Sequence, residues 1–114
     1  MSSAPSRFQS TKTDDIRERF ERLSNRWEDQ SKYLSNTAQM AMLESYQRVI
    51  GLGPAVVPLI LEELRREPDH WFWALESITE ENPVPSELSG DVKAKAEAWI
   101  VWGVKNKLID HDEF

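Results

Sequence analysis

The sequence predicts an all-α protein, a compact bundle of about five helices, and three observations support this prediction. Apolar residues recur three or four positions apart along most of the chain, which is helical spacing. Proline and glycine punctuate these stretches, most clearly at 51–54, 68 and 83–85. No stretch shows the strict apolar–polar alternation of a strand. With 114 residues, 39% of them hydrophobic, the chain fits one domain with a modest core.

The first elements follow from composition and spacing. Residues 1–12 are rich in Ser, Thr and Gln, and we expect a flexible N-terminal arm, because they bury too little apolar surface to offset their ordering entropy. A first helix is expected from Thr13, a candidate N-cap. Outside its apolar stripe, this helix pairs acidic residues with basic residues four positions later in the chain. Its apolar stripe consists of Ile16, Phe20, Leu23, Trp27 and Leu34.

The middle of the chain has clear helix boundaries. A second helix is expected to begin near residues 35–37 and to end at Gly51, which suits a left-handed C-terminal cap. Pro54 suits the first position of the next helix, where its missing N–H costs nothing. That third helix is expected over 55–67. Its start is apolar nearly all round, which predicts the centre of the core.

Two further helices complete the expected bundle. Asp69 is a candidate N-cap for a short fourth helix over 70–79. The last helix is expected over 91–108, with lysines near its C-terminal end, where the helix dipole favours positive charge. Residues 13–109 would then form a single helical domain, followed by an acidic C-terminal tail over 110–114.

One part of the chain is similar to a known repeat. Residues 52–64, then Asp69 and residues 71–78, resemble a HEAT-type repeat, in which a helix started by Gly-Pro is followed by a short turn and a helix with a buried Ala-Leu pair. The resemblance covers residues 50–80. It implies a HEAT-like helix pair at the centre of the bundle, a scaffold that binds other macromolecules with its helix faces.

A second resemblance concerns residues 71–85, which contain the sequences WFWAL and ENPVP. This block is similar to a motif of small uncharacterised bacterial proteins. The similarity implies a bacterial lineage and carries no chemistry of its own.

Composition excludes several function classes. The chain has no cysteine, which removes disulfide scaffolds, thiolate metal sites and cysteine nucleophiles. The formal charge of −6 disfavours general binding to nucleic acid or to an acidic membrane. No apolar run is long enough to span a bilayer, and the N-terminus does not resemble a secretory signal. We therefore expect a cytoplasmic protein with no membrane partner.

Charge is unevenly distributed along the chain. Residues 1–50 hold eight basic and seven acidic side chains, whereas residues 51–114 hold six basic and thirteen acidic ones. A partner of the second half would therefore be a basic or nucleic-acid-bound protein. The simpler alternative is that the acidity keeps a tryptophan-rich protein in solution.

The sequence offers little for catalysis or metal binding. Glu67 and His70 have the Glu-x-x-His spacing of di-iron bundles, but Pro68 breaks the helix that this motif needs. The second histidine, His111, lies in the acidic tail. The serines match no nucleophile signature, and residues 51–53 lack the rest of a dinucleotide or phosphate loop. We expect no enzyme, metal or cofactor, although an enzyme or small-ligand domain with a deep pocket of convergent polar groups stays open.

Five tryptophans are about three times the usual share for this length. Helical wheels place Trp27, Trp71 and Trp99 on core faces and leave Trp73 and Trp102 as candidate surface residues. The last helix also has a second apolar side, nearly opposite its core side, and Gly103 predicts a close helix crossing. The expected protein interface consists of Trp73, Trp102, Val101, Val104 and Leu108. The alternative is that all five are covered within the fold.

These observations lead to two function hypotheses. The first is a non-enzymatic bacterial protein that binds another protein, as an adaptor, inhibitor or antitoxin-like regulator; it could also form a homodimer. The second is a nucleic-acid-binding accessory protein. Its contacts would come from basic residues of the arm and first helix, whose field the neighbouring acidic residues dilute. These residues are Arg7, Lys12, Arg17, Arg19, Arg22 and Arg26.

Overall fold

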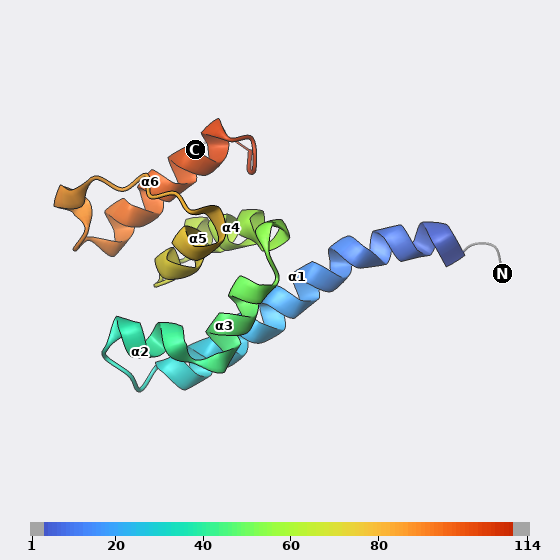
Figure 1. The fold of residues 1–114 in the computed structure, drawn as a ribbon, viewed down its shortest axis with the longest axis horizontal. Helices are drawn as coiled ribbons and strands as arrows, with labels where there is room; N and C mark the ends of the chain where they lie inside the picture. Colours follow the sequence, from blue (N-terminus) through green and yellow to red (C-terminus); the bar gives the residue numbers. More distant parts are fainter. Residues whose placement is uncertain (1–3, 111–114) are drawn as a thin grey trace. The chain divides into compact units, whose positions relative to one another are not determined.

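The computed structural model describes the backbone of residues 4–110 and the side chains of residues 15–110. Within these residues there are six α-helices, two short 3-10 helices and no strand, so the all-α prediction is confirmed (Figure 1). None of the helices in this range is long and apolar enough to cross a membrane. The chain divides into two compact units, Met1–Leu52 and Gly53–Phe114, where the sequence predicts one domain.

The first unit is built on one long helix, α1 (Ala4–Ser31). It begins inside the segment for which the sequence predicts a flexible arm. Once a helix is nucleated, each added residue contributes one backbone hydrogen bond, so even a polar segment can extend it. The predicted stripe is confirmed at its centre, where Phe20, Leu23 and Trp27 are buried.

The predicted second helix is split in two, α2 (Thr37–Met42) and α3 (Glu44–Gly51). Leu43 lies between them with an extended backbone (ψ 143°), which turns the chain. The predicted start is confirmed, because the Asn36 side chain accepts hydrogen bonds from two N–H groups of the first turn of α2. The prediction of a left-handed cap at Gly51 is wrong. Gly51 remains helical, and the residue with a positive φ, of 82°, is Gly53.

The core of the first unit forms between α1 and α3, which pack against each other. The rings of Trp27 and Tyr46, both buried, lie 5.5 Å apart between centroids. The Trp27 indole Nε1 donates a hydrogen bond to the Met40 carbonyl oxygen at 2.9 Å. Trp27 therefore joins α1 to both shorter helices of this unit, and its predicted core position is confirmed.

The second unit starts with a 3-10 turn, η1 (Pro54–Val56), and continues into α4 (Val57–Arg66). Pro54 occupies the first turn, as predicted. Four residues of α4 are buried, which confirms this helix as part of the core. They are Val57, Ile60, Leu61 and Leu64.

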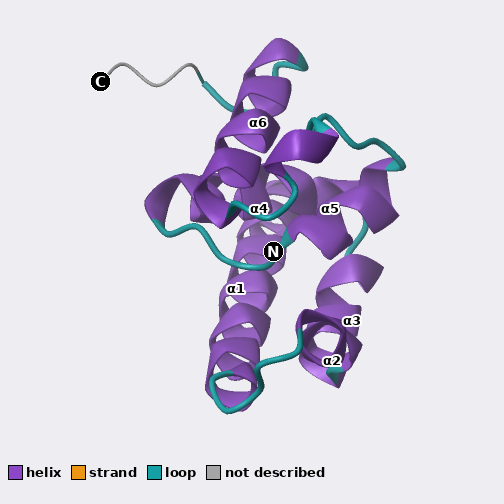
Figure 2. Cartoon of the chain, turned by 90° about the vertical axis from the view of Figure 1, so that its left-hand side faces the viewer, coloured by secondary structure: helices purple, strands orange, loops and turns teal. Residues whose placement is uncertain are grey.

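Two more helices pack on α4, namely α5 (Phe72–Thr79) and α6 (Val92–Lys105); the turn η2 (Ser86–Leu88) lies between them in the chain. Figure 2 draws all described elements of both units as helix or loop.

The prediction that Asp69 caps α5 is wrong. Its carboxylate accepts from the adjacent His70 N–H at 2.7 Å, and α5 begins after Trp71 without a side-chain cap.

Helices α4 and α6 lie side by side and approach closely at Gly103. A Cβ atom placed on Gly103 would lie 2.6 Å from Cδ1 of Leu61, which is itself fully buried. The close crossing predicted from this glycine is therefore confirmed. Asp91 fixes the start of α6 by accepting a hydrogen bond from the Ala94 N–H at 3.0 Å.

Candidate functional site

Helix α6 covers the core of the second unit with one of its two apolar sides. Trp99 and Gly103 are buried on that side, and Trp99 has no exposed surface. Trp71 is equally buried, so the core positions predicted for these two tryptophans are confirmed. This side is fully used in folding and offers no surface to a partner.

The other apolar side of α6 faces a groove, which we call the α4/α6 groove. Its volume is about 600 Å³, and it lies between α6 and the C-terminal end of α4. Six of its ten lining residues are apolar: Leu64, Pro68, Ala96, Ile100, Val101 and Val104. The other four are charged: Arg65, Lys93, Glu97 and Lys105.

Val101 is the most exposed apolar residue that α6 contributes to this groove. Its exposed fraction is 58%, whereas Ile100 and Val104 are half-buried. Helix α4 ends at Arg66, and Pro68, two residues later, is incompatible with its continuation. The second unit thus leaves apolar side chains partly exposed to solvent along the groove, which costs free energy.

The charges that line the groove are mostly positive. The lining contains three cations and one carboxylate, that of Glu97. Residues 51–114 as a whole, by contrast, hold thirteen acidic and six basic side chains. Lys93 and Lys105 are exposed and form no ion pair within residues 15–110. Arg65 donates from Nη2 to the Asp110 carbonyl oxygen at 2.8 Å, which positions its guanidinium beside the groove.

The structure brings together two of the five predicted interface residues, Val101 and Val104. Trp73 is 49% exposed on α5, and Leu108 is 37% exposed after the end of α6; neither lines the groove. Trp102 is half-buried, with its ring edge-on to Trp99 at 5.1 Å between centroids. Trp102 is therefore partly used in packing, as the alternative interpretation expected for all five.

Sequence reasoning missed the contribution of α4 to this site. The lining residues of α6 recur three or four positions apart from Lys93 to Lys105, so this half of the groove is present in the helical periodicity. Leu64 and Pro68 carry no such signal. Their place beside α6 depends on the helix crossing at Gly103, which only the packed structure shows.

The basic residues of the nucleic-acid hypothesis do not form a purely basic surface where they can be described. The four arginines of α1 from Arg17 to Arg26 are exposed, and Arg19 Nε lies 3.3 Å from Asp15 Oδ2 in an ion pair. Acidic residues alternate with them along the helix. The side chains of Arg7 and Lys12 lie outside the described residues.

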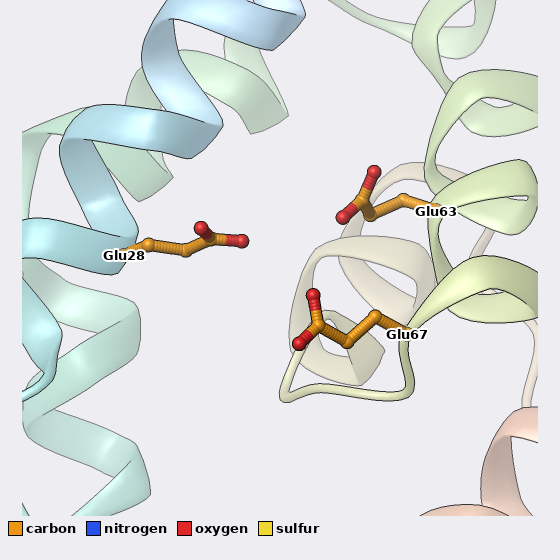
Figure 3. Close-up of side chains that lie close together, drawn as sticks. All are labelled: Glu28, Glu63 and Glu67. Atoms are coloured by element: carbon orange, nitrogen blue, oxygen red, sulfur yellow. The ribbon is translucent and has the colours of Figure 1, made fainter.

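The candidate metal ligands form no site within the described residues of the second unit. His70 follows Asp69 in the turn before α5, and His111 lies outside the described residues. Glu63 and Glu67 project from the end of α4 (Figure 3), but Glu63 accepts two hydrogen bonds from Arg66 Nη2, at 2.6 and 2.7 Å. Glu28, also labelled there, belongs to α1 of the first unit. Two carboxylates, one of them ion-paired, are too few ligands for a hard cation.

Comparisons with protein-family models, curated proteins and solved structures found no significant match to this chain.

Proposed function

We propose that this protein is a non-enzymatic interaction module that binds another protein through the α4/α6 groove, as an adaptor, inhibitor or regulator. The observation that carries the proposal is the exposed Val101 at an apolar groove of about 600 Å³. Grooves between helices that expose apolar side chains are typical docking sites for a partner's apolar residues.

The chemistry of the groove supports binding better than catalysis. Its lining holds no histidine and no hydroxyl group, and three of its four charged members, Lys93, Glu97 and Lys105, are exposed side chains. A catalytic site needs polar groups held in a fixed geometry by their neighbours. Apolar contact surface with charges at its edge is instead the usual anatomy of a protein interface.

Val101→Asp tests the proposal, because a buried carboxylate would disfavour an apolar partner at the centre of the groove. Full-length wild-type and variant chains would be used to capture partners from a bacterial lysate, followed by calorimetry with the purified partner. We expect at least about a tenfold loss of affinity for Val101→Asp, since hot-spot residues cost more than ~1.4 kcal/mol.

Tyr33→Asp is the matched control, because Tyr33 is 85% exposed in the first unit and also becomes an aspartate at an exposed apolar position. Its affinity should equal that of the wild type. A purified partner that binds Val101→Asp as tightly as wild type would contradict the proposal. Salt-sensitive gel-shift binding that is lost in the double variant Arg19→Glu, Arg26→Glu would favour the nucleic-acid hypothesis instead.

A further inference from the structure

The length of the α4/α6 groove suits a short helix. The lining residues of α6 extend from Lys93 to Lys105, twelve positions, which corresponds to about 18 Å at 1.5 Å per residue. The apolar members of α6 lie between these lysines, from Ala96 to Val104, a span of about 12 Å. Three apolar side chains at positions i, i+4 and i+7 of a partner helix cover about that distance.

The charges lie where they would meet the edges of such a helix. Lys93 stands at one end of the apolar row and Lys105 at the other, and both are exposed. The third cation, Arg65, lies on the α4 side. Glu97 is the single carboxylate in the lining. Opposite charges across an interface select the partner and set its orientation, and like charges exclude others.

We propose that the α4/α6 groove binds an acidic amphipathic helix of about three turns, with apolar residues facing Ile100, Val101 and Val104 and carboxylates near Lys93 and Lys105. This inference rests on the proposed function and adds the chemistry of the partner. It reverses the expectation drawn from the acidic second half of the chain, that the partner is basic. Net charge describes the whole half, whereas the partner meets the local charge of the groove.

Three synthetic peptides test the inference without knowledge of the natural partner. Each has about 15 residues with leucines at i, i+4 and i+7, and the flanking positions carry Glu, Gln or Lys. Binding to the full-length chain would be followed by NMR shifts of the Val101 and Val104 methyl groups at low ionic strength, where charge effects are largest. We expect the Glu peptide to bind at least about tenfold more tightly than the Lys peptide.

Charge-reversal variants of the protein provide a second test of the acidic partner. In the variant Lys93→Glu, Lys105→Glu the preference should reverse, and Glu97→Lys should tighten binding of the Glu peptide by about two- to fivefold. The matched control is Lys32→Glu, Lys107→Glu, which changes the net charge equally at two exposed lysines outside the groove lining. It should keep the wild-type order of the three peptides.

The outcomes separate this inference from the proposed function. Equal binding of all three peptides at the Val101 methyls, or a preference for the Lys peptide, would overturn the acidic partner and leave the groove as a docking site. Absence of shifts at these methyls with every peptide would also overturn it, and the capture experiment with Val101→Asp would then judge the proposed function alone. A self-association that Val101→Asp abolishes would make a second copy of this chain the occupant, contrary to the proposal.

Discussion

The two sides of α6 are both apolar, but only one of them is covered by the rest of the second unit. On the covered side Trp99 and Gly103 are buried, and a Cβ atom added to Gly103 would lie 2.6 Å from Leu61 Cδ1. On the open side Val101 is 58% exposed beside the α4/α6 groove. One side of α6 is thus committed to the core, and the other stays open to solvent, where we propose that a partner binds.

Helix α4 contributes to both sides. Its buried Leu61 meets α6 at Gly103, and its C-terminal end supplies Leu64 and Arg65 to the groove lining. The covered side therefore contributes to stability, while the open side should affect partner binding with little effect on folding.

Trp99→Ala should cause the largest loss, about 3–5 kcal/mol in the free energy of unfolding, because it leaves a cavity in a fully buried position. Chemical denaturation of the full-length chain measures this loss. If the variant does not fold, Trp99→Phe keeps the test possible. The indole Nε1 of Trp99 has no hydrogen-bond partner within the described residues, so phenylalanine loses volume but no hydrogen bond. The control is Trp73→Ala, because the Trp73 side chain is 49% exposed, and an equal loss for both variants would contradict the comparison.

Gly103→Ala should destabilise the protein by about 1–2 kcal/mol, even though alanine is the better helix former by ~1 kcal/mol. The reason is the distance of 2.6 Å between the added Cβ and Leu61 Cδ1. The matched control is Gly51→Ala at the end of α3, where nothing lies within 4 Å of the added atom, so its effect should be neutral or stabilising. The measurement is again the midpoint of denaturation. A stabilising Gly103→Ala would show that the crossing has room to adjust.

Val101→Asp should have the smallest effect on folding, within about 0.5 kcal/mol, because the side chain is exposed and its removal leaves no cavity. Thermal denaturation with and without a groove-binding peptide measures both the stability of the free chain and its binding of the peptide. The free chain should melt as wild type does, and the peptide should raise the melting temperature of the wild type alone. A large loss of stability in the free variant would place Val101 in the core and end the division between the two sides.

Much of the fold was predictable because it depends on local chemistry. The apolar stripe of α1, the Asn36 cap and Pro54 at a helix start all depend on residues within one or two turns of each other. The break at Leu43 was not predictable, because the periodicity of apolar residues continues through it. The cap expected from Asp69 was wrong because its carboxylate bonds the adjacent N–H of the turn instead.

The candidate site shows the same limit. Helical spacing marked Val101 and Val104 as a second apolar side, and their place in the groove agrees with that prediction. The same reasoning grouped them with Trp73, which lies on another helix and lines no part of the groove. A helical wheel orders residues around one axis, but it does not say which neighbouring helix covers them.

Residue type and spacing along single segments were enough to predict the helical class, most helix boundaries, the buried tryptophans and the close crossing at Gly103. Packing between helices sets which apolar side of α6 is covered, brings Leu64 and Pro68 to the groove, and makes its charges mostly positive in an acidic half of the chain. These properties arise where residues about thirty positions apart meet, and periodicity within a single helix carries no information about such distant contacts.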